Sequence, residues 1–380
     1  MFTSHNSNPI TASEPLSHRR LEALDILRLL AALAVLLYHF LYRGSIAGGY
    51  LAVSYGLTEG PVPLFYFGVP LFFMISGFVI IWSAEGRSGW QFGKSRVIRL
   101  YPGHVAAMTL TALVIMVWGT PPFEVSFGQW LANLTMVAPV FGQPFMDGVY
   151  WTIVVELIFY FWIALLLLAG ILPRYTERVV ALWLLIIVVD LLLFQSHAAK
   201  LVLLTSYAGC FALGVMAYRI RMHGMTLTRF SLALLAFMLT FTGAERERLV
   251  LIDLLGIAPD ASSVAGAQLF TCLVFAGAVS LPARLTRQGS RMSKVILAGA
   301  GITYPLYLLH QNAGYIFINA LSPFVGKWMA LGIASVVTIL AAWAIWRFVE
   351  PVGRILIRHV FRMLERRWRR LFPAPLAPAE

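Results

Sequence analysis

Long apolar stretches alternate with short polar segments along almost the whole chain. A helix needs about 20 apolar residues to cross the hydrocarbon core of a bilayer, and many of the stretches approach or reach that length. They lie at 21–42, 64–83, 103–119, 150–169, 179–195, 202–219, 230–244, 263–281, 297–320 and 328–349. Backbone polar groups inside a bilayer must bond internally, so the pattern predicts an all-α integral membrane protein, a single bundle of about ten transmembrane helices.

The same pattern divides the chain into three parts. Residues 1–20 are polar, and the apolar run after them is longer than the core of a signal peptide, so we expect an uncleaved first span. Residues 21–351 form the membrane domain. In residues 352–380 arginines alternate with apolar residues, which is typical of an amphipathic helix lying in the cytoplasmic interface.

Composition and charge agree with a membrane location. Hydrophobic residues make up 59% of the chain and charged residues 12%, and the mean hydropathy is +0.79. Most of the 29 Lys and Arg residues fall in segments that share one side if both termini are cytoplasmic, as the positive-inside rule requires. The loop residues on the other side are Arg43, Lys200, Arg246, Arg248 and Lys327.

This topology explains the net charge of +12. The basic residues are dispersed over loops that bound the spans, which favours anionic lipids as partners and argues against nucleic-acid binding. We expect a multi-pass protein of the inner (plasma) membrane. Both cysteines, Cys210 and Cys272, lie within predicted spans, and we expect neither a disulfide framework nor a metal site.

Two ionisable residues stand out inside the first span. Arg28 and His39 are 11 residues apart, or three helical turns, so both point along one face about 16.5 Å apart. Ionisable groups within a span are costly to bury and usually mark a functional site. The pair therefore predicts a buried reaction path.

Further polar positions recur near the ends of other spans. Ser76 and Gly77 in the second span favour close helix packing. Arg96 and Arg99 lie in the next loop, on one helical face, just before Pro102 opens the third span. Paired guanidinium groups suit a phosphorylated ligand, although the same residues also fit a simple positive-inside signal.

The fourth and ninth spans also carry candidate residues. Trp151 lies at the outer interface of the fourth span, and Glu156 lies deeper, where a carboxylate requires a partner. In the ninth span Tyr304 and His310 flank the proline-containing part of the helix. A lone histidine in a span is often a packing residue, so His310 alone indicates little.

Together these positions resemble the acyltransferase-3 family of membrane O-acyltransferases, in its free-standing form without an SGNH domain. The resemblance covers residues 21 to about 351. It rests on six short motifs in register: Asp25-Ile26-Leu27-Arg28 with His39, Ser76-Gly77-Phe78, Arg96-x-x-Arg99-x-Tyr101-Pro102, Trp151 with Glu156 and Phe159-Tyr160, Tyr304-Pro305-Leu306-Tyr307-Leu308-Leu309-His310, and Phe348-Val349-Glu350-Pro351.

The resemblance implies transfer of an acyl group, commonly acetyl from acetyl-CoA, to a hydroxyl of a sugar or related acceptor. Arg28, Arg96 and Arg99 would then hold the phosphates of CoA. His39 would act as general base, which is typically worth about 10²–10⁴-fold in rate, and Glu156 would fix the tautomer of His39. We expect Trp151, Tyr304 and His310 to contact the acceptor or the oxyanion.

Two other functions fit the same residues. A transporter or flippase also places Arg, His and Glu within spans. Alternatively, the acyl acceptor is a small metabolite such as a macrolide. The stretch from 120 to 149 lacks Lys and Arg and is interrupted by prolines, and we expect either a lid or re-entrant segment near the acceptor entrance or a plain loop.

Overall fold

The computed structural model describes residues 21–46 and 49–371, and within these ranges the chain forms helices and no β-strand. The elements are α1 (Glu22–Tyr38), η2 (His39–Arg43), α2 (Gly44–Ile46), η3 (Val62–Phe67), α3 (Gly68–Ala84), α4 (Gly89–Trp118), α5 (Phe127–Asn133), η4 (Ala138–Phe141), η5 (Gly148–Tyr150), α6 (Trp151–Leu168), α7 (Thr176–Val189), η6 (Asp190–Phe194), α8 (His197–Val202), α9 (Ala208–His223), α10 (Leu227–Leu255), α11 (Ala261–Ser280), α12 (Arg291–Val325), α13 (Lys327–Ala344), η7 (Ile345–Val349) and α14 (Glu350–Leu371).

The prediction of an all-α membrane protein is confirmed. Eight helical segments of the described residues are long and apolar enough to cross a membrane. They coincide with eight of the ten predicted spans. The other two, 179–195 and 202–219, fold into the shorter helices α7, continued by η6, and α9. The count of ten spans and the cytoplasmic location of both termini stay predictions.

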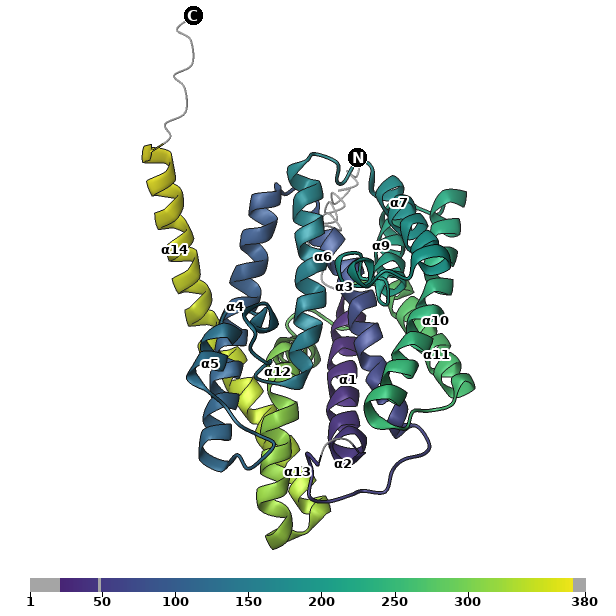
Figure 1. Cartoon of the computed structure of the whole chain (residues 1–380). Coiled ribbons are helices and arrows are strands. Elements are labelled where there is room, and N and C mark those ends of the chain that lie inside the picture. The colour runs from purple at the N-terminus through teal and green to yellow at the C-terminus, as the bar shows by residue number, and fades with distance from the viewer. Residues whose placement is uncertain (1–20, 47–48, 372–380) are drawn as a thin grey trace, which may run out of the picture.

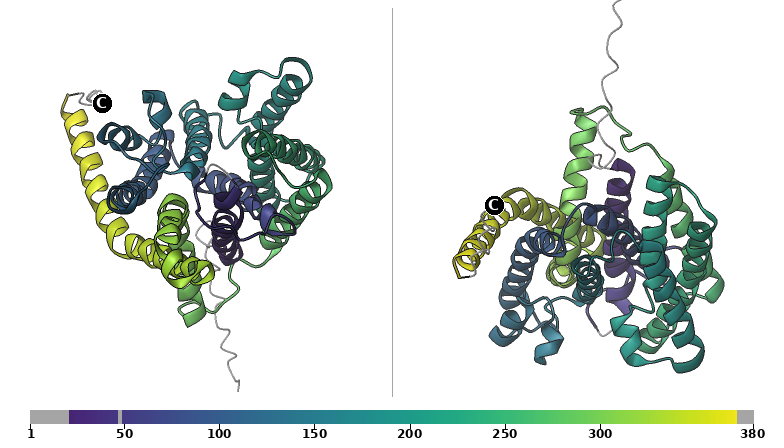
Figure 2. Two further views of the ribbon diagram at one scale, coloured as in Figure 1. Left: turned by 60° about the horizontal axis from the view of Figure 1, so that its bottom comes forward. Right: turned by 90° about the horizontal axis from the view of Figure 1, so that it is seen from above.

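Helix α1 occupies the middle of the bundle (Figure 1). It packs against α3, α11 and α12. Helices α4, α5 and α14 lie to one side of it, and α7, α9, α10 and α11 lie to the other, as two further views confirm (Figure 2). The residues that α1 directs toward its neighbours are therefore enclosed on several sides.

Segments that the charge pattern predicts on one side of the membrane do lie together at one end of the bundle. Glu177, at the start of α7, pairs with Arg219 of α9 and Arg229 of α10 at 3.0 and 2.8 Å. Glu85, after α3, lies 3.5 Å from His223. These contacts bring together the turns after α3, before α7 and between α9 and α10.

The third span begins earlier than the sequence suggested. Helix α4 starts at Gly89, because Ser88 and Gln91 form a reciprocal capping box there. Pro102 lies inside the helix and does not open it. A proline removes one backbone hydrogen bond, which neighbouring helices in a bundle can tolerate. Arg96 and Arg99 therefore project from a continuous helix rather than from a loop.

The tail is helical as predicted. Helix α14 covers 22 residues and contacts α4 where Lys94 Nζ lies 2.7 Å from a Glu365 carboxylate oxygen. The described apolar residues of its outer face are exposed, which suits a helix that rests against lipid. They are Ile355, Leu356, Val360, Leu364 and Trp368. The interfacial placement stays a prediction, and residues 1–20 and 372–380 lie outside the described residues.

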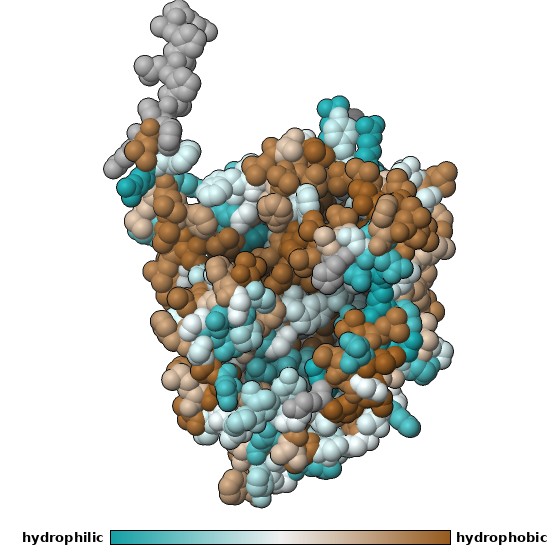
Figure 3. Space-filling view, viewed as in Figure 1, coloured by the Kyte–Doolittle hydropathy of each residue, from teal (hydrophilic) through white to brown (hydrophobic). Residues whose placement is uncertain are grey.

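The surface of the bundle is broadly apolar. Hydrophobic residues gather over the upper part of the face seen in Figure 3, and polar residues are mixed among them lower down. Soluble proteins rarely expose contiguous apolar areas of this kind. The surface therefore agrees with a chain whose helices face lipid.

Small residues set the contact between α3 and α9, as the Ser76 and Gly77 pair predicts. A methyl group added at Gly77 would lie 2.1 Å from the backbone oxygen of Phe211, and one at Gly214 would lie 2.0 Å from that of Met74. Neither backbone oxygen can move without shifting its helix. The two helices are therefore close enough that only glycine fits at these positions.

We expect Gly77→Ala to lower the free energy of unfolding by about 1–3 kcal/mol, because the added methyl separates α3 from α9. The loss should appear as a lower thermal unfolding temperature of the purified protein in detergent. Gly277→Ala is the matched control, since nothing lies within 4 Å of the methyl it would add. An unfolding temperature for Gly77→Ala equal to that of the control would contradict the close contact.

Candidate active site

Three cavities follow one another through the interior of the bundle. The histidine cavity, of about 240 Å³, is lined by His39, Arg43, Tyr66, Trp151, Tyr207 and Glu247 among others. The arginine cavity, of about 100 Å³, includes Arg28, Ser76, Arg96, Arg99, Glu156 and Tyr160. The surface cavity, of about 330 Å³, includes Asp25, Arg28, Arg99, Trp346, Glu350 and Arg354.

Neighbouring cavities share lining residues. Arg28, Arg99 and Tyr304 line both the surface cavity and the arginine cavity. Val69 and Tyr307 line both the arginine cavity and the histidine cavity. The Tyr307 hydroxyl accepts a hydrogen bond from Thr152 Oγ1 at 3.1 Å, which holds the tyrosine at this junction. The three cavities thus form one row from the arginines to the histidine.

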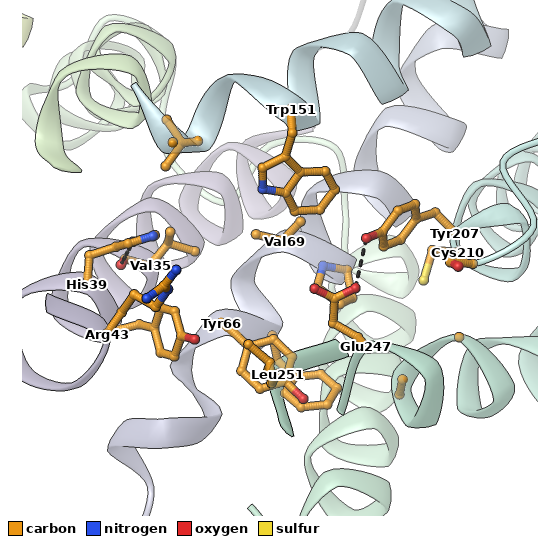
Figure 4. A pocket seen from close by; sticks show the side chains of 18 of the residues that line it. Val35, His39, Arg43, Tyr66, Val69, Trp151, Tyr207, Cys210, Glu247 and Leu251 are labelled. Carbon is orange, nitrogen blue, oxygen red and sulfur yellow. Dashed lines mark hydrogen bonds between the residues drawn. The ribbon is translucent and has the colours of Figure 1, made fainter. Parts of the chain in front are cut away.

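His39 is at the point where α1 changes its winding. The chain continues from α1 into the five-residue π-helix η2, which begins at His39 and ends at Arg43. Short π-helical turns inside longer helices often occur at functional sites. Here the turn carries both His39 and Arg43, which lie close together on one wall of the histidine cavity (Figure 4).

His39 pairs with His310 rather than with Glu156. His39 Nδ1 lies 2.8 Å from the Val35 backbone oxygen and 3.0 Å from His310 Nε2. His310 Nδ1 lies 2.9 Å from the Tyr307 backbone oxygen. His310 is completely buried and lines none of the three cavities, so it supports His39 from behind.

These contacts define the tautomer of each ring. Backbone oxygens only accept hydrogen bonds, so both Nδ1 atoms carry a proton. The His39 Nδ1–H is then shared between Val35 and the lone pair of His310 Nε2. In the neutral ring this leaves His39 Nε2 unprotonated. That nitrogen is the atom a general base requires.

The predicted contact between Glu156 and His39 is wrong. Glu156 lies in the arginine cavity, where it accepts hydrogen bonds from Ser76 Oγ at 2.5 Å and from the Tyr160 hydroxyl at 2.9 Å. The rotation of α6 about its axis directs the carboxylate toward α3. Residue type and depth in the sequence indicated that Glu156 needs partners. Tyr160 is four residues farther along the same helix, but the partner on α3 depends on that rotation.

The arginines do converge. Arg28, Arg96 and Arg99 line the arginine cavity, where Glu156 is the only carboxylate among the described lining residues. Arg28 also lies 3.9 Å from Asp25. The Arg96 guanidinium lies 5.4 Å from the centre of the Phe92 ring. Three guanidinium groups against one carboxylate leave the cavity with an excess of positive charge, which suits an anionic ligand.

The remaining predicted site residues divide between the cavities. Trp151 lines the histidine cavity, and its contact with an acceptor stays a prediction. Tyr304 lines the arginine and surface cavities, at the other end of the row. The segment from 120 to 149 folds against α4, where His104 Nε2 lies 2.8 Å from the Asn133 backbone oxygen. Only Gly148 and Val149 of that segment line the histidine cavity, so its role as a lid stays a prediction.

Sequence reasoning missed Arg43, Tyr207 and Glu247. Arg43 follows His39 by four residues, a spacing that places both on one side of a helix, and this signal was available. Glu247 belongs to an acidic and basic run that follows a predicted span ending at 244. Helix α10 instead continues to Leu255, which carries Glu247 to the histidine cavity.

Asp147 joins the segment before α6 to α12 near the histidine pair. Its side chain is completely buried, and it accepts hydrogen bonds from the backbone N–H groups of Asn312 at 2.8 Å and Val149 at 3.1 Å. Burial raises the pKa of this carboxyl to about 7, although both hydrogen bonds oppose the shift. Asn312 is two residues from His310, so Asp147 helps to position the helical turn that carries the histidine.

The raised pKa makes stability depend on pH. An unfolded aspartate titrates near 3.9, so between about pH 4 and pH 7 the folded protein holds a proton that the unfolded chain releases. We expect the free energy of unfolding to fall as pH rises through this range, by up to about 1.4 kcal/mol per pH unit. Asp147→Asn should remove this contribution when thermal unfolding is followed between about pH 5 and pH 8.

Asp260→Asn is the control for that experiment. Hydrogen bonds from Ser262 and Ser263 hold the pKa of this exposed carboxyl well below its usual range, so it stays charged throughout the window. A pH dependence that is identical in the wild type, Asp147→Asn and Asp260→Asn would show that Asp147 does not titrate near neutral pH.

An all-α membrane bundle in which three arginines and His39 line adjoining cavities, with His310 behind His39, has the features of a membrane-embedded transferase. The sequence model of the acyltransferase-3 family, described as an acyltransferase domain, matches residues 21–347, and the chain belongs to this family. The family resemblance carried by the motifs is thus confirmed. A search of curated proteins and a search of solved structures each gave no match. The protein is a membrane acyltransferase.

No described group of three or more His, Cys, Asp and Glu side chains has an arrangement that would hold a metal ion.

Proposed function

We propose that this protein transfers a short acyl group, acetyl from acetyl-CoA, to a hydroxyl of a cell-surface or lipid-linked sugar at the inner (plasma) membrane. The observation that carries the proposal is the row of three cavities leading from Arg28 and Arg99 to His39. It offers separate places for an anionic donor and a polar acceptor. The family match supports the acyltransferase reaction.

The donor enters at the arginine end. Arg28 and Arg99 line two cavities each and bind phosphate oxygens of CoA, with Arg96 adding positive charge. Glu156 balances part of that charge and orients Ser76 and Tyr160. The narrow arginine cavity suits the extended pantetheine arm, and the 11 residues from Arg28 to His39 rise about 16.5 Å along α1.

The transfer takes place at His39. Its Nε2 removes the proton of the acceptor hydroxyl as the oxygen attacks the carbonyl carbon of the thioester. The tetrahedral intermediate collapses as the C–S bond breaks, and the proton on Nε2 passes to the leaving thiolate of CoA. The products are an O-acyl ester and free CoA. His310 and Val35 keep Nδ1 protonated and Nε2 available throughout.

The proposal is tested with membranes that contain the protein and membranes that lack it. After incubation with acetyl-CoA labelled in the acetyl group, we expect label in the glycan fraction only where the protein is present, and release of that label by mild alkali, which cleaves esters. Free CoA should appear in step with the label.

Label found in a small secreted metabolite would identify the acceptor as a metabolite. Label transferred from succinyl-CoA and not from acetyl-CoA would identify a different donor. Absence of thioester turnover with any acyl-CoA would contradict the proposal and favour a transporter.

A further inference from the structure

The wall of the histidine cavity opposite His39 carries a carboxylate that the transfer step does not use. Glu247 of α10 accepts a hydrogen bond from the Tyr207 hydroxyl at 2.9 Å. Figure 4 shows these two residues across the cavity from His39 and Arg43. Among the described residues that line this cavity, Glu247 is the only carboxylate. A carboxylate accepts up to four hydrogen bonds, and Tyr207 supplies one.

Three other polar side chains that line this cavity have an atom without a hydrogen-bond partner among the described residues. Arg43 Nη1, the Tyr66 hydroxyl and Gln268 Oε1 are buried and have no hydrogen-bond partner among the described residues. Gln268 is completely buried, and Tyr66 is 7% exposed. Nearly all buried polar groups in proteins are hydrogen-bonded. Three unmatched groups around one cavity therefore indicate a polar ligand that reaches several walls.

Aromatic rings complete the cavity. Trp151 and Tyr207 line it with their rings 5.5 Å apart, next to the carboxylate of Glu247. Ligand pockets typically combine apolar and aromatic walls with a few placed polar groups that set orientation. This wall suits a ring that has an apolar face and hydroxyl groups at its edge.

We infer that Glu247, held in place by Tyr207, determines acceptor specificity by binding a hydroxyl group of the acceptor other than the one that is acylated. The acceptor must then carry at least two hydroxyl groups. The hydroxyl that gives its proton to His39 lies at one wall, and the hydroxyl that donates to Glu247 lies at the opposite wall. The inference rests on the proposed function for the identity of the reaction.

The carboxyl group of Glu247 determines which acceptors the cavity favours. The carboxyl oxygens of Glu247 accept hydrogen bonds, so they favour acceptors that present an O–H or N–H group. A site built to bond such a group rejects an analogue without it, because its own buried polar atoms are then left unpaired. Acceptors with a single hydroxyl group should therefore bind poorly.

The test measures binding to the purified full chain in detergent. The probes are methyl glycosides of glucose, galactose, mannose and rhamnose, with cyclohexanol as a ring of similar size that carries one hydroxyl. We expect the wild type to bind at least one glycoside more tightly than cyclohexanol. Glu247→Ala should weaken that binding by about 10- to 100-fold, the usual effect of a hydrogen bond to a charged group. Glu247→Gln and Tyr207→Phe should show smaller losses.

Glu245→Ala is the matched control. Glu245 lies two residues before Glu247 on the same helix, pairs with Arg248 and does not line the cavity. We expect it to bind the glycosides like the wild type, and all variants to bind acetyl-CoA equally. That second readout distinguishes loss of the acceptor site from misfolding.

Two results would overturn the inference. One is a wild type that binds cyclohexanol as tightly as every glycoside. The other is a Glu247→Ala variant that binds the glycosides as Glu245→Ala does. Failure of the proposed function has a different signature, because the wild type would then neither bind nor turn over acetyl-CoA.

Discussion

His39→Gln is expected to lower kcat for acyl transfer by about 10²–10⁴-fold, the range typical for loss of a general base. Glutamine has an amide in place of the imidazole and takes up no proton near neutral pH, so the acceptor hydroxyl must attack without base assistance. The proposed donor site is at the other end of the row of cavities. The KM for acetyl-CoA should therefore change little, and steady-state kinetics that vary donor and acceptor separately will show the difference.

His104→Gln is the control for this substitution. His104 is also completely buried and also contacts a backbone oxygen, but it lines none of the three cavities. The control should keep most of the wild-type kcat. A His39→Gln enzyme as active as His104→Gln would remove His39 from the mechanism. Retained activity with a burst of labelled protein would instead point to a covalent intermediate elsewhere.

Arg99→Ala is expected to raise the KM for acetyl-CoA by about 10- to 100-fold, as loss of a charge-assisted hydrogen bond to phosphate does. Arg99 lines both the surface cavity and the arginine cavity, where we propose that the phosphates of the donor bind. The effect on kcat should be smaller, since His39, where we propose that the transfer takes place, lies farther along the row. Initial rates at varied acetyl-CoA concentration measure both quantities.

Arg87→Ala serves as the control for a loss of positive charge at the same end of the bundle. Arg87 is exposed in the turn between α3 and α4 and lines none of the three cavities. The KM of Arg87→Ala for acetyl-CoA should equal that of the wild type. Arg99→Lys should recover part of the affinity for acetyl-CoA, because lysine keeps the positive charge but cannot make the bidentate contact with phosphate. Equal KM values for Arg99→Ala and Arg87→Ala would exclude Arg99 from the donor site.

Several site residues were found from the sequence, but their contacts were not. Arg28, Arg96 and Arg99 were identified as polar residues near or inside spans, and they do converge on one cavity. His39 and His310 were also identified, yet nothing in their spacing indicated that they pair. Pairing joins residues 271 positions apart, and it depends on how α1 and α12 pack together.

The position of each helix in the chain follows from hydropathy, because a bilayer leaves the backbone almost no alternative to a helix. The rotation of each helix about its axis does not follow from hydropathy, because lipid-facing and protein-facing residues can be equally apolar. That rotation turned Glu156 toward Ser76 of α3 and away from His39.

The all-α membrane architecture, the family and the arginine and histidine candidates can thus be derived from the order of residues, since charge and hydropathy act locally along the chain. The partner of His39, the row of cavities and the place of Glu247 come from packing between helices that are distant in sequence. Close contacts such as that of Gly77 with Phe211 set the rotation and separation of those helices, and with them the side chains that meet.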